Sequence, residues 1–204
     1  MTELQKETEK QILDAARKVF IKKGLDGARM QEIADEAGIN KALLHYYFRS
    51  KDKLFEMIFQ EELGKFFPRM VGLMASTEIP FEEKIRGFVN NYINVFINNP
   101  FLPSFIIREL HRDPEYLQQF FIKSGFNVET IGVAIKGIAD QLNISPDEAR
   151  SFMINMVSIC IFPFAGRPLI ERILFENNHE EYDKFLEQRK TSVVDFILST
   201  LKKN

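Results

Sequence analysis

The histidine, cysteine and carboxylate side chains of this chain of 204 residues form no recognisable catalytic arrangement. The three histidines, His45, His111 and His179, are far apart in the sequence, and no zinc-protease, nucleophile-elbow or glycine-rich phosphate motif is present. The acidic pairs at 82–83 and 180–181 are typical of helix N-termini, where carboxylates interact favourably with the helix dipole. We therefore expect no enzymatic activity, no metal site and no cofactor.

Composition indicates a globular protein of a reducing compartment. Hydrophobic residues make up 45% of the chain, and the formal net charge is -2. The single cysteine, Cys160, excludes an intrachain disulfide, so a cytoplasmic location is expected. Residues 1–10 lack the apolar core of a secretory signal, and the apolar stretch 152–165 is too short to cross a bilayer. We expect no membrane partner.

A short segment near the N-terminus has the pattern of two helices joined by a tight turn. Ala34 is small where two helices cross closely, and Gly38 is able to adopt the left-handed conformation that ends a helix. Ile39 and Leu44 supply apolar side chains for a shared core. The second helix is predicted over about 41–47. This geometry fits a helix-turn-helix that inserts its second helix into the major groove, but an ordinary helical hairpin has the same pattern.

The residues from 38 to 55, GINKALLHYYFRSKDKLF, resemble the recognition-helix signature of the TetR family of bacterial transcriptional regulators. The preceding stretch 12–20, together with Gly24 and the residues 31–34, is also similar at matching spacing. The resemblance covers about the first quarter of the chain. It favours the helix-turn-helix interpretation over the hairpin.

The resemblance implies an all-α fold with two parts. An N-terminal three-helix helix-turn-helix DNA-binding module would occupy residues 1–50, and a C-terminal helical ligand-binding and dimerisation domain would occupy residues 51–204. Residues 1–53 carry a net charge of +2 and the remainder -4, which is a weak indication in the same direction.

The resemblance also implies DNA contacts at the start of the second helix, on the recognition helix and at the start of the fourth helix. The expected DNA-contacting residues are Arg29, Met30, Gln31, Asn40, Lys41, Ala42, Leu43, His45, Tyr46, Arg49 and Lys51. Leu43 stands where many relatives carry threonine and Arg49 where proline is frequent, so the operator sequence is not predictable. Lys51 is expected to anchor a phosphate, and Lys51→Ala is then expected to reduce the salt dependence of binding by about one counterion.

Helix start signals organise the rest of the chain. A long amphipathic helix is predicted from Ser50 to about residue 74. Prolines at 80, 100, 114 and 146 mark further helix starts, and the last is the clearest because Ser145 and Glu148 complete a capping box. A final helix is predicted over about 181–201. No segment shows sustained strand alternation, so the fold class is all-α.

The chain contains 20 phenylalanines and no tryptophan, and most of these rings are expected to form the core because they fall at helical spacing. The family resemblance implies that some of them line a pocket for a small hydrophobic effector. The expected pocket residues are Phe66, Met70, Phe88, Tyr92, Phe105, His111, Phe121, Asn155 and Ser158. Hydrogen bonds within the chain explain Asn155 and Ser158 equally well, and a solvated helix end explains His111.

Reading a palindromic double-stranded DNA operator requires two recognition helices, so we expect a homodimer. The family resemblance implies that its last long helices pair. The expected interface residues are Met153, Met156, Val193, Phe196, Ile197 and Thr200. The sequence therefore predicts a ligand-responsive DNA-binding transcriptional regulator, a repressor released from its operator by a small hydrophobic effector. The alternative is a module that binds a hydrophobic small molecule and has lost DNA binding.

Overall fold

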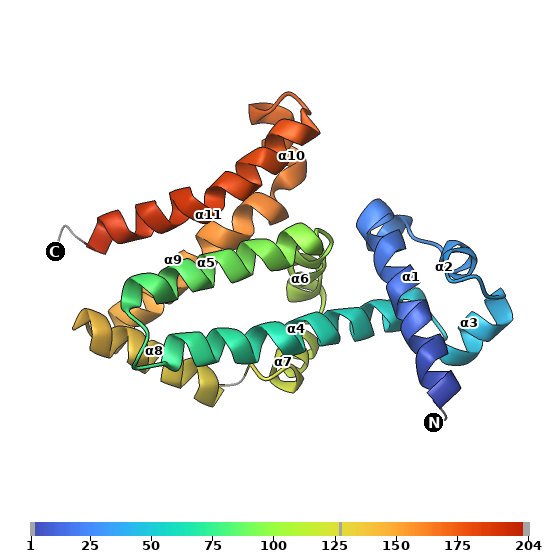
Figure 1. Cartoon of the computed structure of the whole chain (residues 1–204), viewed down its shortest axis with the longest axis horizontal. Coiled ribbons are helices and arrows are strands. Elements are labelled where there is room, and N and C mark those ends of the chain that lie inside the picture. The colour runs from blue at the N-terminus through green and yellow to red at the C-terminus, as the bar shows by residue number, and fades with distance from the viewer. Residues whose placement is uncertain (1–2, 127, 202–204) are drawn as a thin grey trace.

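The computed structural model describes residues 3–126 and 128–201. Within these ranges the chain forms α-helices and no β-strand, which confirms the all-α class (Figure 1). The helices are α1 (Glu3–Gly27), α2 (Met30–Glu36), α3 (Lys41–Tyr47), α4 (Lys51–Ala75), α5 (Phe81–Asn98), α6 (Leu102–Arg112), α7 (Pro114–Lys123), α8 (Val128–Leu142), α9 (Pro146–Ala165), α10 (Arg167–Leu174) and α11 (His179–Leu201).

The helices α1, α2 and α3 form a small bundle at one end of the molecule (Figure 1). Its core is built by side chains such as Phe20, Ile33 and Leu44, which are fully buried. Helix α1 starts earlier than its apolar stripe predicts, and it is kinked at Gly24, whose φ is 68° and ψ is 177°. A positive φ favours glycine, so this residue type allows the bend.

Helix α4 joins the small bundle to the remaining helices and contributes to the cores of both (Figure 1). It begins at the predicted cap, because the side chain of Ser50 accepts a hydrogen bond from the backbone N–H of Lys53. It runs for 25 residues and contains Pro68 in its interior. One face is buried along almost its whole length.

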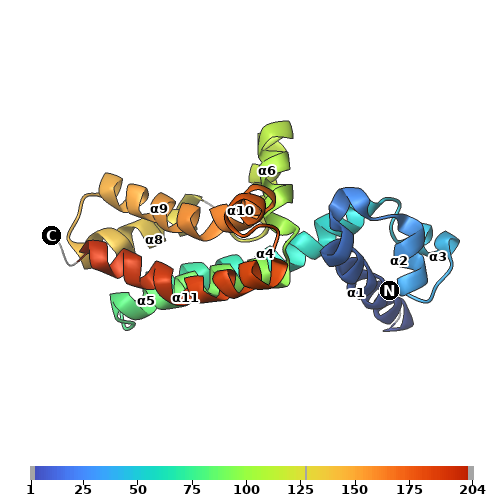
Figure 2. The same ribbon diagram turned by 90° about the horizontal axis from the view of Figure 1, so that it is seen from above.

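The larger C-terminal part packs around α4 and α5. Helix α11 lies along α5, and α8 packs between α4 and α9 (Figures 1 and 2). The short pair α6 and α7 lies where α4 leaves the N-terminal bundle (Figure 1). Helix α9 begins with the predicted capping box of Ser145 and Glu148. Helix α8 has no proline start signal, and the sequence pattern did not single it out.

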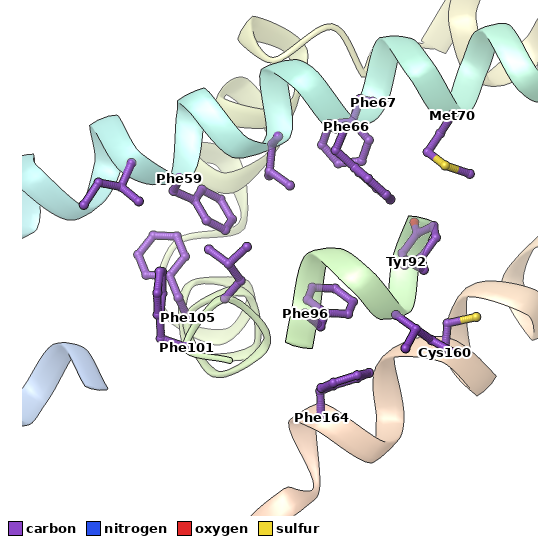
Figure 3. Packing of buried hydrophobic residues seen from close by; sticks show 14 of the residues in the cluster. Phe59, Phe66, Phe67, Met70, Tyr92, Phe96, Phe101, Phe105, Cys160 and Phe164 are labelled. Carbon is purple, nitrogen blue, oxygen red and sulfur yellow. The ribbon is translucent and has the colours of Figure 1, made fainter. Parts of the chain in front are cut away.

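Aromatic rings fill the interior in two groups along α4 (Figure 3). Near the N-terminal bundle, Phe105 packs against Phe55 and Phe59 with ring centroids 4.5 and 4.7 Å apart. Further along α4, Tyr92 packs against Phe66 at 4.7 Å. All five rings are buried, so the prediction that the phenylalanines form mainly core is confirmed for the four phenylalanines among them.

Among residues 3–126 and 128–201, no single helix has the length and apolar character required to cross a membrane. The bent pair α9 and α10 meets the length and composition criteria only when its two helices are taken together, and they meet at an angle of 71°.

Candidate functional site

The turn between α2 and α3 fixes the angle of the second helix. Gly38 has a φ of 64°, which L side chains rarely adopt. The backbone N–H of Ile39 donates to the carbonyl of Ala34 at 3.0 Å, so the chain reverses within three residues. Leu44 then inserts its fully buried side chain into the bundle. These contacts build the predicted helix-turn-helix.

Helix α3 is capped by Asn40 and turns most of its side chains to solvent. The Asn40 Oδ1 atom accepts a hydrogen bond from the backbone N–H of Leu43 at 2.8 Å, so this side chain caps the helix. Because only Leu44 is fully buried, the remaining surface is open to a partner. We call this surface the α3 face; it consists of the exposed residues Lys41, Ala42, Leu43, His45 and Tyr46.

The predicted contacts outside α3 differ in exposure. Arg29, Gln31 and Arg49 are exposed, and Gln31 donates from Nε2 to Oδ1 of Asp35 at 2.8 Å. Met30 is half-buried and packs against the core of the bundle. These positions are available for the DNA contacts that the sequence predicts, and those contacts stay predictions.

Lys51 has a structural role that the sequence did not indicate. Its Nζ atom donates to the backbone carbonyls of Leu25 at 2.9 Å, Asp26 at 3.1 Å and Ala28 at 3.3 Å. These carbonyls belong to the end of α1 and to the residue beyond it, where helical hydrogen bonds run out. The ammonium group has three hydrogens, and all three are engaged. This arrangement is at odds with Lys51 as a phosphate anchor.

Besides Lys51, the side chains of Arg17 and Asp26 connect α1 to the C-terminal part through polar contacts that no sequence pattern indicated. Arg17 of α1 donates to Glu62 of α4 at 2.5 Å, and the same carboxylate accepts from Asn99 Nδ2 at 3.2 Å. Asn99 is buried at the end of α5. Separately, Arg108 Nη1 of α6 lies 3.2 Å from Asp26 Oδ1. The two residues of each of these contacts are 37 to 82 positions apart in the sequence, so no local sequence pattern reveals the contacts.

A cavity of about 50 Å³ lies among α4, α5, α8 and α9. Of the predicted pocket residues, Met70, Phe88 and Tyr92 line it. Phe66 packs against Tyr92, and Phe121 packs against Phe67 at a centroid distance of 5.5 Å. The complete lining is Phe67, Met70, Val71, Met74, Phe88, Tyr92, Phe126, Ile131, Ala134, Met153 and Val157. Burial raises the pKa of Tyr92 well above its ordinary value of 10.

Four predicted pocket residues lie elsewhere. Phe105 belongs to the ring group near the N-terminal bundle, apart from Tyr92 and Met70 (Figure 3). His111 is exposed at the end of α6, as a solvated histidine would be. Asn155 and Ser158 are exposed on α9, because that helix turns Met156 and Cys160 inward instead. Neither intrachain hydrogen bonds nor a pocket is needed to account for these two polar side chains.

The predicted interface residues divide between the inside and the outside of the chain. Met156, Val193 and Ile197 are buried within the single chain, and Met153 lines the cavity. Phe196 has 56% of its surface exposed, and Thr200 is also exposed. Of this set, only these two residues face solvent and are available to a second copy in the arrangement described.

Two further features of the α9–α11 region concern ionisable groups. Glu171 is buried, which raises its pKa, but hydrogen bonds from Arg167 at 3.0 Å and from His179 outweigh burial and lower the pKa below its ordinary value. Burial raises the pKa of the Cys160 thiol to about 12. Within the described ranges, no group of three or more His, Cys, Asp or Glu residues is arranged to hold a metal ion.

Sequence comparison agrees with the helix-turn-helix. Residues 12–58 match the sequence model of the bacterial regulatory proteins of the tetR family. The chain is 24% identical over 182 residues, 86% of each protein, to the Probable HTH-type transcriptional regulator YttP of Bacillus subtilis (strain 168). It is 31% identical over 106 residues to the HTH-type transcriptional repressor NicS of Pseudomonas putida, which covers 52% of this chain and 50% of NicS.

Solved structures share the whole fold. A transcriptional regulator of the TetR/AcrR family from Thermobifida fusca superposes with a TM-score of 0.63 at 17% identity, covering 92% of this chain and 97% of that one. FadR from Bacillus subtilis, solved in complex with stearoyl-CoA, superposes with a TM-score of 0.59 at 18% identity, covering 93% and 97%. The N-terminal motif, its α2–α3 geometry and this shared architecture agree: residues 12–58 match the tetR family of bacterial regulatory proteins, and the chain has the fold of these solved structures.

Proposed function

We propose that this chain is one half of a homodimeric repressor that occupies a palindromic operator and leaves it when a small hydrophobic effector binds. The observation that carries the proposal is the α3 face, five consecutive or near-consecutive side chains exposed on a helix that Asn40 and Gly38 hold in place. In this proposal residues 1–50 read DNA, and residues 51–204 bind the effector and the second copy.

Each group on and around the α3 face has a distinct role in DNA recognition. Lys41 opens the helix and reaches a phosphate or the acceptor atoms of a guanine. Leu43 has 37% of its surface exposed and offers an apolar contact to a thymine methyl group. Arg29 and Arg49 flank the helix and contact phosphates, which position the protein without reading sequence.

The dimer places a second copy against the outer faces of α9 and α11. Phe196 of α11 and Ile154 and Phe162 of α9 have 56%, 64% and 64% of their surface exposed, respectively. Single exposed apolar residues are ordinary on a monomer, but three on neighbouring helices fit burial by a partner. Asn155 and Ser158, exposed on the same helix, would supply polar contacts at this interface.

The effector enters the cavity among α4, α5, α8 and α9. A volume of about 50 Å³ is well below the roughly 300–1,000 Å³ of sites for small molecules, so binding requires the lining to move. Met70, Met74 and Met153 line the cavity, and methionine side chains adapt readily to new shapes. The FadR structure holds stearoyl-CoA, whose acyl chain is apolar, and this supports an effector with an apolar part here.

Release of DNA then follows from differential binding. An effector shifts the equilibrium only if it binds more tightly to the dimer shape whose α3 helices are misplaced for the operator. Helix α4 starts beside the helix-turn-helix and carries Met70 and Met74 to the cavity, so it links the two sites directly. By linkage, the operator must weaken effector binding by the same factor.

Fluorescence anisotropy tests the proposal. The protein is titrated onto DNA from upstream of its own gene and onto scrambled DNA, each at two salt concentrations. We expect tight, salt-dependent binding that prefers the upstream DNA. Lys41→Ala should weaken it, whereas Lys136→Ala, an equal charge change on the exposed surface of α8, should not. Equally weak binding to both DNAs, unaltered by Lys41→Ala, would contradict DNA recognition by the α3 face.

A further inference from the structure

A groove of about 390 Å³ separates the end of α1 from α6. Gly24, where α1 is kinked, is one of the residues that line this groove. Ile21 and Asp26 contribute to one wall, and Phe101, Ser104 and Arg108 contribute to the other. The groove is distinct from the effector cavity, because the two share no lining residue.

The groove combines an apolar surface with two cationic residues, Lys23, which pairs with Glu32 at 2.7 Å, and Arg108. Phe101 and Phe105 form part of its floor, and Ile21 has 45% of its surface exposed above them. The guanidinium of Arg108 lies over the Phe105 ring, 5.4 Å from its centroid. Its Nε atom donates to the buried carboxylate of Glu109 at 3.0 Å. Stacking and this hydrogen bond hold the guanidinium at the edge of the groove.

The ion pair between Asp26 and Arg108 indicates which ligand group Arg108 binds in the groove. The Asp26 carboxylate lies 3.2 Å from Arg108 Nη1, although the Asp26 side chain is 92% exposed. An ion pair that is so exposed to water contributes little to stability. Another carboxylate in the groove can therefore replace Asp26 at a small cost in free energy. Guanidinium groups suit carboxylates because their N–H donors match the two oxygens.

We propose that the groove between α1 and α6 is a second ligand site, which binds an aromatic monocarboxylate. Its carboxylate takes the place of Asp26 on Arg108, and its ring lies against Ile21, Phe101 and Phe105. Ligand sites occur preferentially where two structural units meet, as this groove does. The inference goes beyond the hydrophobic effector proposed above, in location and in ligand charge. Occupancy would break the Asp26–Arg108 contact, which is one of the polar contacts between α1 and the C-terminal part.

Binding is tested without DNA by titrating the full-length protein with 2-naphthoate. The isoleucine methyl groups are labelled with ¹³C and followed by NMR. We expect a saturable shift of the Ile21 methyl signal, while Ile154, 64% exposed on α9, stays unchanged. The neutral analogue 2-naphthalenemethanol should bind about two- to fivefold more weakly, because it lacks the charge that Arg108 recognises. Equal binding of both compounds would overturn the recognition by Arg108.

Removing the competing carboxylate gives the sharpest result. Asp26→Asn should tighten 2-naphthoate binding about three- to sixfold, the range expected when a weak surface ion pair no longer competes. Asp14→Asn is the matched control, because it makes the same charge change on the exposed side of α1, away from the groove, and should leave binding unaltered. If Asp26→Asn weakens binding or leaves it unchanged, the proposal is wrong.

Filling the groove is an independent test. Ser104 is exposed in the groove, and Ser104→Trp should abolish the Ile21 shift. Ile107→Trp, on the same helix but outside the lining, should retain it. Shifts that persist in Ser104→Trp, or that appear mainly at methyl groups around the effector cavity, would show that the acid binds elsewhere.

Discussion

Replacing Lys51 by alanine separates two roles for one side chain. A phosphate anchor contributes to DNA binding and little to folding, whereas a side chain that holds the end of α1 contributes chiefly to folding. The three hydrogen bonds from its ammonium group to the carbonyls of Leu25, Asp26 and Ala28 favour the second role. We therefore expect Lys51→Ala to lower the stability of the fold.

The magnitude follows from the number and kind of these bonds. A hydrogen bond to a charged group contributes about 1.5–3 kcal/mol when buried, but Lys51 is only half-buried and its three bonds are not additive. The dipole of α1 adds about 0.3–1 kcal/mol for a cation at its C-terminal end. A total of about 3 kcal/mol is reasonable. For a protein of this size, such a loss lowers Tm by roughly 6–12 °C.

Thermal unfolding followed by circular dichroism measures the effect, with Lys53→Ala as the matched control. Lys53 lies two residues away and pairs only with Glu56 on the surface, at 2.6 Å, so its loss should cost less than about 1 kcal/mol. The salt dependence of DNA binding should be the same in Lys51→Ala as in the parent protein. Equal Tm values for the two variants, with a salt slope reduced by about one in Lys51→Ala, would refute the structural role and restore the phosphate contact.

Three other expectations concern α9, α10 and α11. Phe196→Glu should give monomers by analytical ultracentrifugation with an unchanged circular dichroism spectrum, because the side chain is 56% exposed; a dimer of parental stability would argue against this interface. Cys160 should react with a disulfide reagent at pH 8 at least roughly a hundredfold faster in urea than in the folded protein, since burial raises its pKa to about 12; comparable rates would contradict that burial. The lowered pKa of Glu171 means that its ionised form stabilises the fold above about pH 4.5 and that this contribution disappears as the pH falls further. Glu171→Gln should therefore cost about 1–3 kcal/mol in urea unfolding at pH 7 and less at pH 3.5, and an equal loss at both pH values would contradict the ion pairing.

Much of the backbone architecture could be predicted from local signals. Asn40 caps α3 and Gly38 takes a positive φ, as their residue types suggest, and both features help to build the helix-turn-helix. Pro114 and Pro146 occupy the first residues of α7 and α9. Such features act within three or four residues of the chain, so the sequence shows them directly. Helix α8 was not predicted because it begins without such a signal.

The direction of side chains was harder to predict, because it depends on partners distant in sequence. Asn155 and Ser158 lie in an apolar stretch, which made a buried pocket role reasonable, yet α9 presents them to solvent. Phe105 has the same residue type and helical spacing as Phe88, but α6 carries it into a different ring group. Lys51 finds its acceptors 23 to 26 residues earlier. None of these outcomes is encoded in spacing alone.

The mechanical properties of α4 follow from Pro68. An unbroken helix of its 25 residues would be a rod about 37 Å long and equally stiff throughout. Proline lacks the N–H that would bond to the carbonyl four residues earlier, and its ring crowds that turn, so bending is easiest there. Pro68 lies between Lys51, next to the helix-turn-helix, and Met70, at the cavity. A displacement at Met70 therefore bends α4 at Pro68 and also rotates the whole helix. The more easily the helix bends in the turn before Pro68, the less of the displacement reaches α3.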